Sequence, residues 1–236
     1  MDQFPFEIES QPDDATCGPT CLHAVYRYYG DRMSLESLIA DVPTVDSGGT
    51  LAVWLACHAL ARGYSATLYT YNLQLFDPTW FLPGVDLAAK LEAQSTRKDE
   101  DHLTASTKGY LDYLRLGGSV RFEDLSAKVI RKFVKRRVPI LTGLSATYLY
   151  RDMREHGPDG DSDDVRGLPV GHFVVLCGYR QDARRVLVAD PLHPNPLSEH
   201  HVYEVSIERV IGAILLGIVT YDANLLVLTP GKRIRA

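Results

Sequence analysis

The sequence has no apolar run long enough to cross a lipid bilayer, which takes about 20 residues. Its longest apolar stretch, residues 210–219, is far too short. Residues 1–11 are acidic and lack the basic start and apolar core of a secretory signal. We therefore expect a cytoplasmic protein, from a bacterium, that has no membrane partner.

An excess of positive charge is also missing, since 25 Lys and Arg face 30 Asp and Glu, for a net charge of -5. A phosphate-binding surface usually needs clustered cations, so we expect no nucleic-acid partner. The basic stretch 128–137 contains Val129, Ile130, Phe133 and Val134 at helical spacing. This pattern predicts the solvated side of an amphipathic helix.

Cysteine is scarce, and the four residues Cys17, Cys21, Cys57 and Cys177 come without an export signal. They indicate free thiols in a reducing compartment. A structural zinc site would need tighter cysteine pairs and a second ligand pair, which we do not find. The acidic stretch 159–164 begins like a calcium loop but has Asp at its sixth place, where glycine is required, so we interpret it as an acidic loop. We expect no metal and no cofactor.

The first half of the chain is predicted to be mainly helical. A helix at about residues 16–30 can be capped by Thr16, tolerates Pro19 in its first turn and stops at Gly30. Further helical stretches are expected at about residues 34–40, 50–62 and 76–137.

After residue 137 the pattern changes to short segments rich in Val, Ile, Leu and Phe and bounded by Gly, Pro or Asp, as strands are. The expected strands are residues 139–144, 171–179, 185–189, 202–205 and 225–228, with a short helix from Ser206 before the last. Helices followed by strands favour an α+β fold over alternating βαβ units. We find no repeat and no linker, and expect one two-lobed domain over residues 1–236 with a helical insertion at about 76–137.

Cys17 lies within Thr16-Cys17-Gly18-Pro19, at the expected start of the first helix. Unpaired N–H groups and the helix dipole favour a negative charge there, and therefore a thiolate. The same N–H groups could donate to the oxyanion that forms when sulfur attacks a carbonyl. Gly18 would let a substrate approach the backbone closely. Cys17 is therefore the candidate nucleophile.

A nucleophilic cysteine needs a proton acceptor, for which His172, at the start of the strand 171–176, is the best candidate. Asp190 ends the next strand and could orient the imidazole. Two adjacent antiparallel strands would place His172 and Asp190 at the same end of the sheet. That geometry is what a Cys-His-Asp triad requires.

Each of these residues also has a plainer interpretation. A cysteine in a helix is most often a small buried apolar group. A histidine that opens a strand, or an aspartate before proline, most often serves structure or a turn. The catalytic hypothesis depends on finding all three in order and in context.

The chain also contains Gln11, five residues, then Cys17-Gly18-Pro19-Thr20-Cys21, followed later by the strand 171–176 and by Ala189-Asp190-Pro191. This pattern resembles the bacteriocin-processing double-glycine peptidases and their stand-alone relatives, which are papain-like. The resemblance extends from about residue 10 to residue 218.

The resemblance implies a papain-like fold in which Cys17 is the nucleophile, His172 the general base and acid, and Asp190 the orienting carboxylate. It further implies that Gln11 donates a side-chain N–H to the oxyanion hole; otherwise Gln11 would be an ordinary turn residue. Exporter-linked members of the family sit on a transporter with a phosphate-binding loop. This chain has no G-x-x-x-x-G-K-[ST] pattern, so cleavage of a bacteriocin leader is not carried over.

We expect a cysteine peptidase or amidase that acts on a peptide or small amide and forms a thioester on Cys17, which water resolves. If an amine accepts the acyl group, the same residues would give a transpeptidase or acyltransferase, and amines would compete with water. A non-catalytic binding protein on this scaffold is the third possibility. The presence of Gln11, Cys17 and His172 favours an enzyme, but it does not exclude a binding protein.

Overall fold

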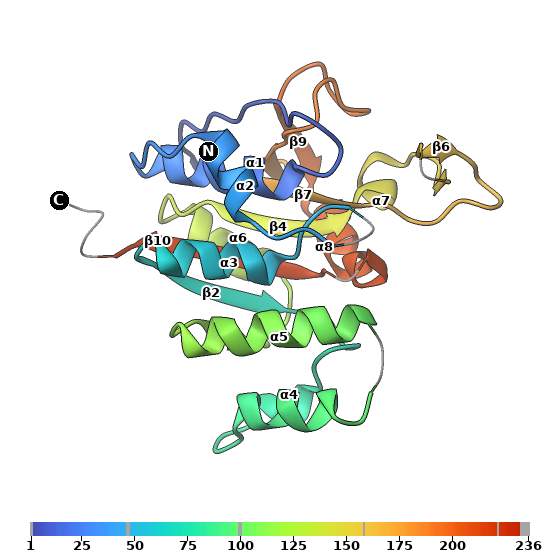
Figure 1. The fold of residues 1–236 in the computed structure, drawn as a ribbon. Helices are drawn as coiled ribbons and strands as arrows, with labels where there is room; N and C mark the ends of the chain where they lie inside the picture. Colours follow the sequence, from blue (N-terminus) through green and yellow to red (C-terminus); the bar gives the residue numbers. More distant parts are fainter. Residues whose placement is uncertain (1, 46–47, 99–100, 158, 221, 232–236) are drawn as a thin grey trace.

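The computed structural model describes residues 2–45, 48–98, 101–157, 159–220 and 222–231. Within them, the main feature is an 8-stranded sheet in the order β3-β2-β10-β4-β7-β8-β9, with β1 paired to β7 (Figure 1). Its strands are β1 (Asp2–Gln3), β2 (Tyr64–Thr70), β3 (Ser119–Arg121), β4 (Ile140–Ser145), β7 (Gly171–Arg180), β8 (Arg185–Ala189), β9 (Val202–Ser206) and β10 (Asn224–Pro230).

Most of the helices pack around this sheet, and the structure confirms the predicted α+β class. The helices are α1 (Cys17–Tyr28), α2 (Leu35–Asp41), α3 (Ala52–Ala61), α4 (Leu87–Ser95), α5 (Asp101–Arg115), α6 (Ala127–Val134), α7 (Ala146–Tyr150) and α8 (Ile207–Leu216), with 3-10 turns at η1 (Pro78–Phe81) and η2 (Gly217–Thr220). Of these, α4 lies on α5 (Figure 1). A second sheet of two short strands, β5 (Glu155–His156) and β6 (Asp161–Ser162), lies apart from the main one.

Every strand predicted after residue 137 is present, but the order of helices first and strands later is wrong. β2 lies in the first half of the chain and pairs along its whole length with β10. β3 lies within the stretch predicted to be helical and pairs in parallel with β2. β2 is a short aromatic and β-branched segment whose pairing partner is more than 150 residues away, so its environment is not visible locally. The acidic stretch 159–164 is likewise not only a loop, since it contains β6.

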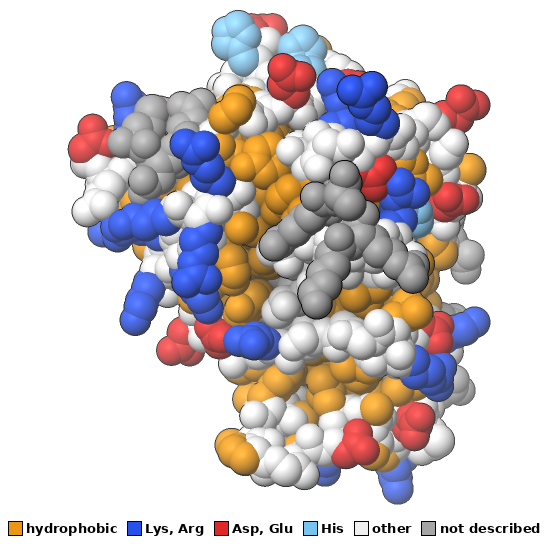
Figure 2. Space-filling model, turned by 90° about the vertical axis from the view of Figure 1, so that its left-hand side faces the viewer, with side chains coloured by type: hydrophobic (Ala, Val, Ile, Leu, Met, Phe, Trp, Pro, Cys, Tyr) orange, Lys and Arg blue, Asp and Glu red, His pale blue; other side chains and the backbone are white. Residues whose placement is uncertain are grey.

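The two faces of the sheet carry different helices. Tyr64 stacks on Tyr26 of α1, whereas Tyr69 on the same strand packs against Phe133 of α6. Residues an odd number apart on a strand point to opposite faces, so α1 and α6 lie on opposite sides. The four apolar residues named from the sequence are buried in α6 and its exposed residues are basic, as predicted. Figure 2 shows Lys and Arg side chains gathered along one flank of the molecule.

β7 is the central strand for the site, because it is hydrogen-bonded to β4 on one side and to β8 on the other. Its interior is buried throughout, and only Gly171 at its start is exposed. β4 pairs with it so that Leu144 lies opposite His172, and β8 pairs so that Ala189 lies opposite Val175. Asp190 therefore comes level with Val174, on the same face of the sheet as His172.

A buried carboxyl group lies between β10 and α3. Oδ1 of Asp222 accepts hydrogen bonds from the backbone N–H of Ala52, at 3.3 Å, and from Nδ2 of Asn224, at 2.8 Å. Gly143 leaves room for it, since a Cβ there would come within 2.7 Å of the Asp222 Cβ. Burial raises the pKa of Asp222 to about 7, even though both hydrogen bonds favour the ionised form.

We expect Asp222→Asn to stabilise the protein more at pH 8 than at pH 5. The pKa of Asp222 in the folded state, about 7, lies above its ordinary value of 3.8, so the wild-type protein loses stability as the pH rises between these two values. Asparagine cannot ionise, and its amide oxygen can still accept both hydrogen bonds. In urea unfolding experiments, the variant should gain free energy of unfolding relative to the wild type, and this gain should be larger at pH 8 than at pH 5 by about 2–3 kcal/mol. An equal effect at both pH values would contradict this account.

Candidate active site

A tight turn over residues 11–16 leads into α1. Asp13 organises it, because its Oδ1 accepts from the N–H of Ala15 at 2.9 Å and its carbonyl oxygen accepts from the hydroxyl of Thr16 at 3.0 Å. The turn is also fixed to the other side of the site, since the N–H of Gln11 donates to the carbonyl of Pro191 at 2.9 Å. The residues before Cys17 are thereby held beside the segment that follows Asp190.

α1 begins at Cys17, and the predicted role of Thr16 as its cap is wrong. Thr16 occupies the cap position, but no side chain caps the helix, because the Thr16 hydroxyl bonds to the backbone of Asp13 instead. The N–H groups of the first turn are therefore left without a side-chain acceptor. They carry the positive end of the helix dipole, next to the buried thiol of Cys17.

One contact with the sheet and one with the loop before α3 fix the start of α1. Sγ of Cys21 donates to the carbonyl of Phe173, the residue after His172, at 3.2 Å. Burial raises the pKa of Cys21 well above its ordinary value, so this group remains a neutral thiol donor. Gly18 lies so close to the loop before α3 that a Cβ there would come within 2.5 Å of Cγ2 of Thr50.

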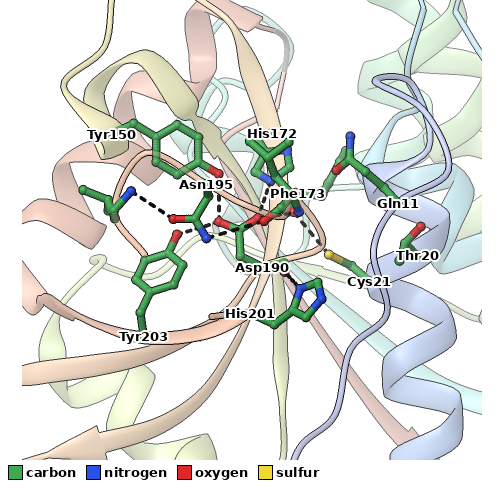
Figure 3. A network of polar contacts seen from close by, with 12 residues as sticks. Gln11, Thr20, Cys21, Tyr150, His172, Phe173, Asp190, Asn195, His201 and Tyr203 are labelled. Atoms are coloured by element: carbon green, nitrogen blue, oxygen red, sulfur yellow. Dashed lines mark hydrogen bonds and ion pairs between the residues drawn. The ribbon is translucent and has the colours of Figure 1, made fainter. Parts of the chain in front are cut away.

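His172 and Asp190 form a buried pair at the start of β7. Nε2 of His172 lies 2.8 Å from Oδ1 of Asp190, whose side chain is fully buried (Figure 3). A backbone donor supports this geometry, because the N–H of Leu192 donates to the same oxygen at 3.0 Å. The register of β7 and β8 is the reason these side chains meet, as described above.

Two tyrosines complete the surroundings of Asp190, and neither was among the residues selected from the sequence. The hydroxyl of Tyr150, at the end of α7, donates to Oδ2 at 2.7 Å, and the hydroxyl of Tyr203 on β9 donates to it at 2.5 Å. Tyr203 lies within the predicted strand 202–205, and the need of a buried tyrosine hydroxyl for a polar partner is the signal that could have identified it. Tyr150 had no such local signal.

Cys17 lies within reach of the imidazole of His172. Burial lowers the pKa of His172, but hydrogen bonds to Asp190 and Cys17, together with the charges of both groups, outweigh this effect and raise the pKa to about 10. Because Nε2 faces Asp190, Nδ1 is the ring nitrogen left for the thiol. The structure therefore brings Cys17, His172 and Asp190 together.

Gln11 lies at the edge of the same network (Figure 3). Its Nε2 donates to the carbonyl of Asp13 at 2.9 Å, and its Oε1 is buried with no hydrogen-bond partner among the described residues. The amide is thus partly engaged within its own turn. Nε2 carries a second hydrogen, and this is the one that could serve an oxyanion.

The described residues offer no group of three or more His, Cys, Asp or Glu that could hold a metal ion. All four cysteines are free thiols, as predicted. None of the described helices combines the length and apolar character of a bilayer-spanning segment. A thiol, an imidazole and a carboxylate in series form the set of groups that supports nucleophilic attack on a carbonyl.

No family model and no curated protein matches the chain. Among solved structures, the peptidase domain of Streptococcus ComA, a bi-functional ABC transporter involved in quorum sensing, is 16% identical, with a TM-score of 0.46 over 96% of this chain and 99% of that one. A double-glycine-motif protease from an AMS/PCAT transporter, in complex with the leader peptide, is 13% identical, with a TM-score of 0.45 over 97% and 94%.

Xylellain, a cysteine protease from Xylella fastidiosa, is 15% identical, with a TM-score of 0.48 over 98% of this chain and 85% of that one. These proteins are peptidases, the class that the sequence motifs resemble. At such identities and scores we draw no conclusion from them about activity.

We expect Gly18→Ala to destabilise the fold by about 1–3 kcal/mol, because the new Cβ would overlap Cγ2 of Thr50. Thr50→Ser removes that methyl group and keeps the hydroxyl that donates to the carbonyl of Pro43. The double variant should therefore recover part of the loss in a thermal unfolding experiment, with Thr50→Ser alone as the control. Equal stabilities of Gly18→Ala and the double variant would show that the contact is not the cause.

The imidazole of His172 should titrate near pH 10 in NMR spectra, and Asp190→Asn should lower this value. The pKa in the folded state exceeds the ordinary value of 6.5, so protonation of His172 stabilises the fold below about pH 6.5. This contribution is lost as the pH rises through about 10. A wild-type midpoint near 6.5 would refute the assigned ion pair.

Proposed function

We propose that the protein is a cysteine peptidase or amidase that cleaves an amide bond through a thioester on Cys17. The observation that carries the proposal is the position of the Cys17 thiol, at an uncapped helix start and within reach of an imidazole that a buried carboxylate holds. This combination supports a thiolate and imidazolium pair, because the high pKa of His172 favours its protonated form at neutral pH.

In the first half of the reaction, the sulfur of Cys17 attacks the carbonyl carbon of the substrate. A C–S bond forms and the carbonyl electron pair moves onto oxygen, where the N–H of Cys17 and the Nε2 of Gln11 are the proposed donors. When the oxyanion collapses, the C–N bond breaks and His172 gives its proton to the leaving amine. The product is a thioester on Cys17.

In the second half, water attacks the thioester and His172 accepts the proton that water loses. The C–S bond breaks, the acid product leaves, and the sulfur of Cys17 is again paired with the imidazolium. Asp190 remains ionised throughout and keeps Nε2 of His172 oriented. Its pKa is held below the usual range, since hydrogen bonds from His172, Tyr203 and Tyr150, and the charge of His172, outweigh the effect of burial.

The proposed substrate is a peptide or a small amide, because the site is arranged for attack on a carbonyl. The proposed location is the cytoplasm, since four free thiols fit a reducing compartment.

At a pH near 6, we expect a small alkylating reagent such as iodoacetamide to modify Cys17 faster than the other three cysteines. An ordinary thiol is almost entirely protonated at that pH. Mass spectrometry of the folded protein would follow each cysteine. Cys57 is the matched internal control, because it is more exposed than Cys17 while its pKa is raised to about 11 by burial and by Asp112. If accessibility alone set the rate of alkylation, Cys57 would react faster. If the thiol of Cys17 is activated, Cys17 reacts faster.

The variant His172→Ala should slow the modification of Cys17 and leave that of Cys57 unchanged. If Cys17 reacts no faster than Cys57 in the wild-type protein, the thiolate mechanism fails and a binding role becomes the better explanation. Once a substrate is found, added amines separate the two enzyme classes, since only an acyltransferase would form the amine adduct in preference to the acid.

A further inference from the structure

Both oxygens of the Asp190 carboxylate are occupied, and they have different partners. Oδ1 faces Nε2 of His172 at 2.8 Å, and Oδ2 accepts the hydroxyl groups of Tyr150 at 2.7 Å and Tyr203 at 2.5 Å (Figure 3). Two phenol donors on one oxygen fix the plane of the carboxylate. A carboxylate held in this way cannot turn Oδ1 away from the imidazole without losing both bonds.

The element that carries Tyr150 is itself attached to the strand that carries His172. In α7, the N–H of Ala146 donates to the carbonyl of Val170, and the N–H of Val170 donates to Oγ1 of Thr147 at 3.0 Å. Val170 directly precedes β7. The position of the Tyr150 hydroxyl is therefore set relative to the start of the same strand.

Tyr150 and Tyr203 approach Asp190 from different elements. The ring of Tyr150 also lies 6.1 Å from the imidazole of His172, centroid to centroid, at an angle of 50°. Tyr203 comes from β9, where it pairs with Val188 on β8, two residues before Asp190. One tyrosine thus contacts both members of the His172–Asp190 pair, and the other contacts the carboxylate alone.

We infer that Tyr150 and Tyr203 are positioning residues that keep Asp190 ionised and keep its Oδ1 directed at His172. The catalytic meaning of this inference rests on the proposed function, but the geometry does not. Hydrogen bonds to an ionised carboxyl group favour that form, which a fully buried site would otherwise disfavour.

Among the described residues, no Arg or Lys is named as a hydrogen-bond partner or charge acting on Asp190. Its titratable neighbours are His172 from β7, the two tyrosines, Cys21 from α1, and His201, whose Nδ1 bonds to the backbone carbonyl of Asp190. Burial raises the pKa of both phenols far above the ordinary value, so they remain protonated donors. The two phenol hydroxyl groups therefore stabilise the ionised carboxylate, as an arginine beside a buried carboxylate would.

The test is an NMR titration of the Nε2–H proton of His172 in wild-type protein and in Tyr150→Phe, Tyr203→Phe and the double variant. A proton shared with a carboxylate gives a far-downfield signal, which is lost when that carboxylate takes up a proton. In the double variant, we expect this signal to be lost at a pH about one unit or more higher than in the wild type. The reason is that the two hydroxyl groups that donate to the ionised form of Asp190 are gone. Each single variant should lie between these limits.

Tyr148→Phe is the matched control, since Tyr148 lies on the same helix and its half-exposed side chain makes no hydrogen bond to Asp190 among the described contacts. It should titrate as the wild type does. If the double variant also titrates as the wild type does, the two tyrosines only fill space and the inference is wrong. If the double variant fails to fold, the single variants decide the question in the same way.

The titration involves no substrate, so it separates the two proposals. A shifted titration with an unreactive Cys17 would leave the tyrosines as positioning residues in a protein that is not this enzyme. If the titration is unshifted but Cys17 reacts fast near pH 6, the positioning role of the tyrosines is refuted and the proposed function is not.

Discussion

The buried carboxylate of Asp190 is the group on which the geometry of the site depends. It accepts hydrogen bonds from β7, α7 and β9 and from the backbone of Leu192, so four parts of the chain meet at two oxygen atoms. The backbone of Asp190 is also fully hydrogen-bonded. Its N–H donates to the carbonyl of His201, and its carbonyl accepts from Nδ1 of that residue. Fully buried charge is costly unless every lone pair is satisfied, and here the satisfaction of the charge also determines where His172 points.

A second set of contacts brings the thiol to this pair. The segment before α1 bonds through Gln11 to Pro191, and α1 bonds through Cys21 to Phe173. Both attachment points lie one residue from a member of the pair, Asp190 in the first case and His172 in the second. The nucleophile is therefore attached to the chain directly beside each member of the pair.

Much of this arrangement could be predicted from the sequence, because it depends on local signals. The strands that carry His172 and Asp190 are short apolar runs with clear ends, and the start of α1 follows from a helical pattern after a polar turn. The rest depends on contacts between distant segments. Tyr150 and Tyr203 meet Asp190 only once β4, β8 and β9 are in register, and β2 is recognisable as a strand only beside β10. Thr16 looked like a cap, but its hydroxyl has a closer partner in Asp13.

The contact between Gly18 and Thr50 has a consequence for the evolution of this chain. The side-chain methyl of residue 50 occupies the space that a Cβ at residue 18 would need. The two positions, one in the first turn of α1 and the other in the loop before α3, are therefore not free to change independently. Relatives that share this backbone should keep glycine at position 18 wherever position 50 is branched at Cβ and carries a methyl group. A larger residue at position 18 should occur only after position 50 has lost that methyl, so the order of substitutions is constrained as well as their identity.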